Sequence, residues 1–149
     1  MNNLINGVTL TPLKQIPLND GGVFHIMKDS DHGYHGFGEA YLSEVMPGCT
    51  KGWKKHKQMV VNLSVPYGSV KVVIFDDRSD SESQGKFAEF ILSRDKNYSR
   101  VTIVPGLWFG FQCLSDFPAA ILNIGNIKHD PDEVFSKSLS KINFDWRLK

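Results

Sequence analysis

The stretch Pro47–Arg78, PGCTKGWKKHKQMVVNLSVPYGSVKVVIFDDR, contains two strand-like runs joined by one tight turn. The first run alternates between polar and apolar residues with a period of two, which is typical of a β-strand buried on one face. Its polar, basic face carries Thr50, Gly52, Lys54, His56, Gln58, Val60, Asn62 and Ser64. Its opposite face carries Met59, Val61, Leu63 and Val65. This pattern predicts a barrel or sandwich with a polar pocket inside one sheet.

Short strand-like segments, separated by glycine and proline, occupy most of the remaining chain. We expect strands at 8–16, 23–27, 37–46, 87–92 and 98–104, and a polar loop at 28–38. The segment 130–139, DPDEVFSKSL, has the pattern of one short helix, with Asp130 as its cap and Pro131 at its first position. Together these elements predict an all-β antiparallel sandwich or jelly roll, in a single domain that spans residues 1–149.

The bulk composition disfavours several classes of function. The 149 residues carry a formal net charge of +1, so we expect no binding to nucleic acid or to a membrane surface through bulk charge. The start of the chain has no basic segment followed by a long apolar core, and no run approaches the ~18 apolar residues that cross a bilayer. We therefore expect a soluble, cytoplasmic protein.

Four motifs, taken in order, resemble those of one known family. They are PG-x-x-KGWKKH from Pro47, VPYGSVKVVIFDDR from Val65, VPGLWFGFQCLSD from Val104 and HDPDEV…DW from His129. In this order they make the chain similar to the dTDP-4-dehydrorhamnose 3,5-epimerase family over nearly its whole length, from Gly7 to Trp146. The resemblance implies a cupin-type double-stranded β-helix, or jelly roll, to which the segment 130–139 adds a short C-terminal helix.

The resemblance also implies an activity. The family's enzymes act on nucleotide-linked 4-keto-6-deoxysugars in bacterial surface-polysaccharide synthesis. They remove a proton from a carbon next to the keto group and return one from the other side, which needs a base, an acid on the opposite face and cationic groups for the diphosphate. We therefore expect a 3- and/or 5-epimerase-like isomerase of a dTDP- or UDP-linked 4-keto-6-deoxyhexose. Family members are usually homodimers that lend N-terminal strands to the partner sheet, so a homodimer is expected too.

The first motif carries the catalytic candidates that the resemblance implies. The family's Arg-Gly-Leu-His pattern aligns Lys51 with its phosphate-binding arginine and Lys54 with its histidine base. His56 follows on the same predicted strand face as Lys54 and is the alternative base. Strict alternation puts Lys51 on the opposite face, so a twist or bulge at Gly52 is needed to bring both lysines to one ligand. The choice between Lys54 and His56 as the base stays open.

We expect no metal and no cofactor. A cupin metal site needs a His-x-His pair followed by a carboxylate and a later histidine. The run Lys54-Lys55-His56 breaks that pair, and the remaining histidines lack ligand spacing. The family's epimerases imply neither a metal nor a nicotinamide.

The chain departs from the family's pattern at several positions. Phe109 replaces the histidine of Pro-Gly-x-x-His-Gly-Phe, and the early Arg-Gly-x-Phe-x-Glu motif reads GGVFHI at 21–26. The segment that holds the family's tyrosine acid reads Ile127-Lys128-His129, so His129 is the candidate acid. These losses keep two alternatives open: a catalytically inactive cupin that binds a sugar nucleotide, and a 3,4-ketoisomerase that moves the carbonyl.

Further candidates are residues that could contact the sugar nucleotide. They are Lys51, Glu39, Tyr41, Asn62, Arg78 and Trp108. Glu39 and Tyr41 share a predicted strand face. Instead of contacting the sugar nucleotide, Arg78 could form an ion pair with Asp76. Trp108 could likewise pack in the core.

Overall fold

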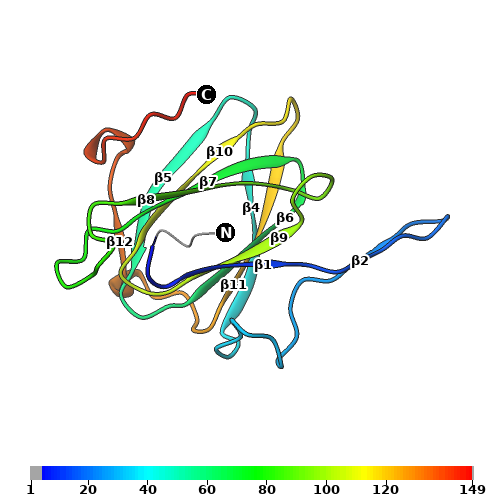
Figure 1. Ribbon diagram of the computed structural model, residues 1–149, viewed down its shortest axis with the longest axis horizontal. Helices are drawn as coiled ribbons and strands as arrows, with labels where there is room; N and C mark the ends of the chain where they lie inside the picture. The colour runs from blue at the N-terminus through cyan, green and yellow to red at the C-terminus, as the bar shows by residue number, and fades with distance from the viewer. Residues whose placement is uncertain (1–4, 149) are drawn as a thin grey trace.

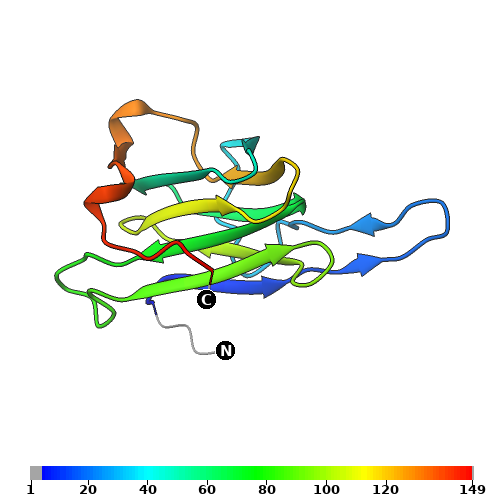
Figure 2. The same cartoon turned by 90° about the horizontal axis from the view of Figure 1, so that it is seen from above.

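The structure, a computed structural model, describes residues 5–148; residues 1–4 and 149, the two ends of the predicted domain, lie outside the described residues. Two five-stranded antiparallel sheets face each other (Figures 1 and 2). Sheet I has the order β1 (Val8–Pro12), β9 (Ser99–Ile103), β6 (Val61–Tyr67), β11 (Ala119–Gly125) and β4 (Glu39–Val45). Sheet II has the order β12 (Val134–Ser136), β5 (Thr50–His56), β10 (Trp108–Cys113), β7 (Ser69–Phe75) and β8 (Phe87–Ser93). This architecture is the expected cupin-type jelly roll.

A two-stranded hairpin, β2 (Gln15–Ile16) and β3 (Val23–Phe24), projects from the sandwich (Figures 1 and 2). The expected strand at 8–16 is thus divided into β1 and β2, since Pro12 ends the ladder of the edge strand β1. Within residues 5–148 no helix is long and apolar enough to cross a membrane.

The main core lies between the two sheets. Val61, Leu63 and Val65 of β6 belong to one buried cluster with Val72 and Ile74 of β7. Leu63 and Ile74 are fully buried, and burying a side chain of this size contributes roughly 1.5–3 kcal/mol. The alternating apolar residues of the central stretch therefore hold the two sheets together.

The chain passes from β6 to β7 through a tight turn at Gly68. This glycine has a φ of 81°, and a Cβ there would lie 2.7 Å from the Cα of Ala119. Only glycine fits both the positive φ and the close approach of β11. The turn carries the chain from sheet I to sheet II, rather than joining two strands of one sheet.

The alternation that the sequence predicts for the central stretch breaks between His56 and Val61. β5 ends at His56 in sheet II, and β6 begins at Val61 in sheet I. Because the chain changes sheet here, the face of a residue in β5 does not set the face of a residue in β6. Asn62 lies on the outer face of sheet I, where its Nδ2 donates to the backbone oxygen of Gly33 at 2.9 Å. The predicted common face of His56 and Asn62 is therefore wrong.

The C-terminal segment covers the outer face of sheet II (Figure 2). A second apolar cluster there joins Trp53, Val73 and Trp108 to Ile142, with Trp146 packed against it. This arrangement places Trp108 outside the space between the sheets, and its Nε1 donates to Asp77 Oδ2 at 2.8 Å. Trp108 thus has the structural role that was the alternative to a substrate contact.

The predicted helix at 130–139 is wrong beyond its first turn. Asp130 caps a 3-10 helix, Pro131–Glu133, by accepting a backbone N–H through its Oδ1 at 2.9 Å. The expected cap and the expected proline at the first position are confirmed. Val134 and Phe135 continue as β12, which pairs with β5, because β-branched and aromatic residues favour a strand. A second 3-10 helix follows at Leu139–Lys141.

Candidate functional site

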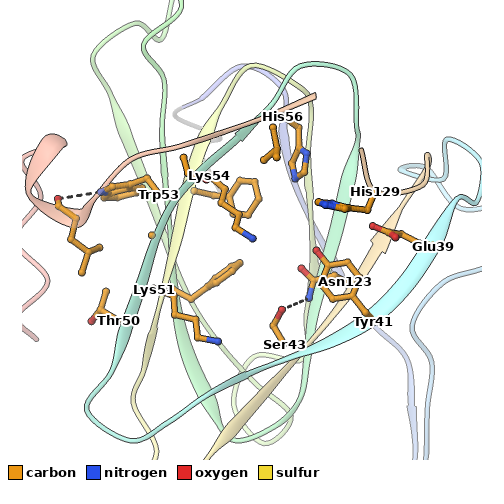
Figure 3. Close-up of a pocket in the computed structure, with 16 residues that line it drawn as sticks. Glu39, Tyr41, Ser43, Thr50, Lys51, Trp53, Lys54, His56, Asn123 and His129 are labelled. Carbon is orange, nitrogen blue, oxygen red and sulfur yellow. Dashed lines mark hydrogen bonds between the residues drawn. The ribbon is translucent and has the colours of Figure 1, made fainter. Parts of the chain in front are cut away.

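A cavity of about 410 Å³ opens between the sheets (Figure 3). This volume lies within the ~300–1,000 Å³ that is typical of small-molecule sites. Sheet I lines it with Glu39, Tyr41, Ser43 and Asn123. Sheet II lines it with Lys54, His56, Phe109 and Phe111. The cavity thus has an apolar floor from β10 and polar walls from β4, β5 and β11.

His56 lies at the end of β5 with its ring on the cavity wall. The ring stacks on Phe109 with 5.8 Å between centroids, and its Nδ1 is hydrogen-bonded to Oε1 of Glu133. Because an ionised carboxylate only accepts, Nδ1 carries a proton, and whenever the ring is neutral its lone pair is on Nε2. This contact fixes the ring orientation and the tautomer of His56.

Glu133 is itself buried, with 6% of its surface exposed. Its Oε2 accepts from the backbone N–H groups of Gln58 at 3.1 Å and Met59 at 3.2 Å. Burial by itself would raise the pKa of this carboxyl, but the hydrogen bonds from His56 and from the two amides outweigh burial, and the pKa is lowered. The carboxylate therefore stays ionised beside His56 at neutral pH. Glu133 is not among the site residues predicted from the sequence, although it stands in the Asp-Pro motif.

Lys51 and Lys54 both border the cavity (Figure 3). Lys54 pairs with Phe109 and Lys51 pairs with Phe111, so β5 has one more residue than β10 over this interval. The register shift is the bulge expected at Gly52, and the bulge is therefore confirmed. It lets both lysines border the same cavity.

The two ammonium groups differ in their surroundings. Nζ of Lys51 donates to the backbone oxygen of Glu44 at 2.5 Å. The side chain of Lys54 makes no hydrogen bond or ion pair with any residue in 5–148; Asp76, for example, pairs with Arg78 instead. Lys54 therefore presents an uncompensated positive charge to the cavity, which suits an anionic ligand.

The opposite wall comes from β4. Glu39, Tyr41 and Ser43 alternate along this strand and all face the cavity, which confirms the predicted common face of Glu39 and Tyr41. Partial burial raises the pKa of the Tyr41 phenol, and the negative charge of Glu39 raises it further. The phenol therefore keeps its proton at neutral pH.

Asn123 is a site residue that the sequence did not reveal. It lies on β11 directly opposite Tyr41 and is 4% exposed. Its Nδ2 donates to Ser43 Oγ at 3.2 Å and to the backbone oxygen of Ile121 at 3.0 Å. Since a carbonyl oxygen only accepts, the amide orientation is fixed, and Oδ1 remains as an acceptor on the cavity wall. The available signal was a single amide among the apolar, inward-facing residues of 119–125.

Three of the six predicted substrate contacts lie outside the cavity. Asn62 and Trp108 occupy the outer faces of sheets I and II, as described above. Arg78 forms a bidentate ion pair with the fully buried Asp76, in which Nε donates to Oδ1 and Nη2 donates to Oδ2, at 2.8 Å each. The structural ion pair is therefore the interpretation that the geometry supports for Arg78. The other three, Lys51, Glu39 and Tyr41, border the cavity, as does the candidate acid His129.

No group of three or more His, Cys, Asp or Glu side chains in the described part of the chain could hold a metal ion. The titratable groups of the cavity are the oriented imidazole of His56, a second histidine, one phenol, two ammonium groups and the carboxylate of Glu39. Such a set can abstract and return protons beside a bound anion.

Comparison with known proteins shows what the chain is similar to. A solved structure of a dTDP sugar isomerase from Desulfovibrio desulfuricans G20 has a TM-score of 0.92 and 35% sequence identity, and the match covers 96% of this chain and 92% of that one. The spore coat polysaccharide biosynthesis protein SpsL of Bacillus subtilis is 25% identical over 150 residues, covering 98% of this chain and 99% of its own length. The probable low-salt glycan biosynthesis epimerase Agl13 of Haloferax volcanii is 32% identical over 99 residues, covering 63% of this chain and 62% of its own. No family model matches the chain.

The fold and these similarities define a jelly-roll protein of the sugar-nucleotide epimerase and isomerase class. Solved dTDP-4-dehydrorhamnose 3,5-epimerases share the fold, with TM-scores of 0.80 to 0.84 at 18 to 24% identity. The chain belongs to the dTDP-4-dehydrorhamnose 3,5-epimerase family, as a divergent member.

Proposed function

We propose that the protein is a 3- and/or 5-epimerase of a dTDP- or UDP-linked 4-keto-6-deoxyhexose that serves surface-polysaccharide synthesis. The observation that carries this proposal is the buried His56–Glu133 pair, which supplies an oriented base in a cavity bordered by two lysines. The relatives support it by name, one as a dTDP sugar isomerase, one as a probable glycan epimerase and one as a polysaccharide biosynthesis protein.

His56, rather than Lys54, is the base in this proposal. Its Nε2 has a lone pair aimed by the Glu133 contact, whereas an ammonium group is a proton donor and a positive charge. Abstraction of the proton next to the keto group leaves an enolate, whose negative oxygen needs a cation or a hydrogen-bond donor. Lys54 lies two residues before His56 on the same strand face and supplies that charge.

Lys51 is the proposed anchor for the diphosphate. It borders the cavity on the same side as Lys54, and its side chain is at the surface, where the charged end of a ligand stays solvated. The apolar floor made by Phe109 and Phe111 suits the carbon face of a sugar ring. The cavity therefore offers separate places for the ring and for the charged link to the nucleotide.

We also propose that the protein works as a homodimer in the cytoplasm, where its proposed nucleotide-activated substrate is available. The projecting β2–β3 hairpin carries exposed Leu18 and Val23, and the edge strand β4 exposes Leu42 on the face away from the cavity. Exposed apolar side chains on an arm and an edge are typical of surfaces covered by a second copy. Light scattering after size exclusion should give twice the chain mass, and Leu18→Asp with Val23→Asp should shift it toward one chain mass. A wild-type protein that stays at one chain mass over the whole concentration range would contradict the homodimer.

The activity is tested by ¹H NMR of the protein in D₂O with dTDP- and UDP-4-keto-6-deoxyglucose. We expect the C3 or C5 proton signal to disappear and an epimer to form, and His56→Ala to abolish both changes. Ligand line-broadening with both protons intact over hours would show a catalytically inactive binder instead. A product with its carbonyl at C3 would show a 3,4-ketoisomerase.

A further inference from the structure

Inversion of a carbon needs a proton from the side opposite to the base. His56 comes from β5 of sheet II, and the wall across the cavity comes from β4 and β11 of sheet I. Tyr41 is on that wall, and Figure 3 shows its ring directed into the cavity beside Asn123. Of the four tyrosines, which are all described, Tyr41 alone borders the cavity.

We propose that Tyr41 is the catalytic acid, which gives its phenolic proton to the face of the sugar ring opposite to His56. This inference rests on the proposed epimerase function and adds to it the residue that completes inversion. It assigns the acid to β4, and not to the segment 127–129 where the family pattern places it.

Two features of the wall suit this role. The ordinary state of the phenol at neutral pH is protonated, and both burial and the charge of Glu39 raise the pKa of Tyr41. The neighbouring Asn123 offers an acceptor, Oδ1, whose direction is fixed by the donation of Nδ2 to Ser43 and Ile121. A sugar hydroxyl bound to this oxygen would hold the ring against the β4 wall, within reach of the phenol.

His129, the acid expected from the sequence, also borders the cavity and lies in the segment between β11 and the first 3-10 helix. It precedes the 3-10 helix that delivers Glu133 to His56, so it belongs to the segment that anchors the base. The side chains of His129 and Tyr41 are both exposed, and neither makes a hydrogen bond or ion pair within residues 5–148, so the difference between them lies in the backbone that carries them. Tyr41, by contrast, stands on a strand whose backbone is paired along its whole length with β11. A rigid strand holds a reacting group better than an exposed loop does.

The C–H bond next to the keto group breaks, its proton goes to Nε2 of His56, and the electron pair forms the enolate, with negative charge on the former keto oxygen. The O–H bond of Tyr41 then breaks, and its proton adds to the same carbon from the other face as the carbonyl is restored. The imidazolium loses its proton and the phenolate regains one by exchange with water, which returns both groups to their starting state.

The test compares wild type with Tyr41→Phe, using full-length protein and dTDP-4-keto-6-deoxyglucose in D₂O. ¹H NMR follows two rates at the same carbon: deuterium exchange with retention, and inversion. In Tyr41→Phe we expect inversion to fall by at least ~100-fold, the lower range of acid–base catalysis. Exchange with retention should continue, because His56 still removes the proton and returns a deuteron to the same face. The ongoing exchange also shows that the variant is folded.

Tyr67→Phe is the matched control, because Tyr67 is exposed at the β6–β7 turn and lies outside the cavity; both of its rates should equal those of wild type. Inversion by Tyr41→Phe at the wild-type rate would overturn the assignment, and so would a parallel fall of exchange and inversion. If wild type itself neither exchanges nor inverts, the epimerase proposal fails and this assignment is overturned with it. If wild type does exchange and invert, the epimerase proposal stands, and the rates of Tyr41→Phe then test the assignment of Tyr41 alone.

Discussion

Glu133 follows His56 by 77 positions, yet its carboxylate holds the Nδ1 of that histidine inside the sandwich. Strand β12, directly after Glu133, pairs with β5, and Val134 lies opposite His56 in that pairing. The backbone ladder and the side-chain contact thus fix the same two segments together. The C-terminal part of the chain is therefore needed to build the proposed base.

Glu133→Gln should slow exchange and inversion together by at least ~10²-fold. A glutamine amide can donate to Nδ1, which would move the imidazole proton to Nε2 and remove the lone pair that abstracts the substrate proton. NMR in D₂O measures both rates, and the ¹⁵N shifts of the His56 ring report its tautomer. Full activity with an unchanged tautomer would show that the carboxylate has no catalytic function.

Lys51→Met should weaken dTDP binding by about tenfold, which corresponds to roughly 1.4 kcal/mol for a charge-assisted contact. Lys54→Met should leave dTDP binding close to that of wild type, because the proposed partner of Lys54 is the enolate oxygen of the sugar, which dTDP lacks. Lys55→Met is the matched control, because Lys55 lies on the other face of β5, where it pairs with Asp77 at 3.1 Å. Isothermal titration calorimetry at two salt concentrations gives the comparison. Equal losses of dTDP affinity for Lys51→Met and Lys55→Met would indicate that the lysines act only through the general charge of the surface.

The sequence predicted those parts of the molecule that depend on local patterns. Alternation in 37–46 placed Glu39 and Tyr41 on one wall, and alternation in 50–56 placed Lys54 and His56 on another, because each pattern stays within one strand. The same rule failed for Asn62, because the chain changes sheet between β5 and β6 and the period of two is interrupted.

Long-range contacts could not be predicted in this way. Nothing near Glu133 indicates that its carboxylate is buried against His56, since that contact depends on the pairing of β12 with β5. A helix over 134–136 has no ladder with β5, so the error in secondary structure also hid the contact between Glu133 and His56. Asn123 was missed for a related reason: its role follows from its position opposite Tyr41 in the β11–β4 ladder.

Asp76→Asn should destabilise the protein by about 3 kcal/mol at neutral pH, because it leaves Arg78 without its buried partner. Burial alone would raise the pKa of Asp76, but hydrogen bonds from Arg78, Ser81 and Ser83 outweigh it and lower the pKa well below 3.8. A carboxyl with a lowered folded-state pKa stabilises the fold above its unfolded pKa, and this contribution is lost as the pH falls toward the folded value. The difference between wild type and variant in urea unfolding should therefore shrink below about pH 4. A difference that is independent of pH from 7 to 3 would contradict this account.

Asn123→Ala should lower kcat/KM for the sugar nucleotide by about tenfold and leave dTDP binding unchanged, because its Oδ1 is placed to accept from a sugar hydroxyl that dTDP lacks. Ser43→Ala is the comparison variant, since it removes one acceptor of Nδ2 and leaves the second, the backbone oxygen of Ile121. Ser43→Ala should lower kcat/KM by less than Asn123→Ala does, because the Asn123 amide keeps its orientation. Kinetics with the sugar nucleotide and calorimetry with dTDP measure the two quantities. An equal loss of dTDP affinity would place Asn123 at the nucleotide instead of the sugar, and an unchanged kcat/KM would mean that its oxygen contacts no substrate hydroxyl.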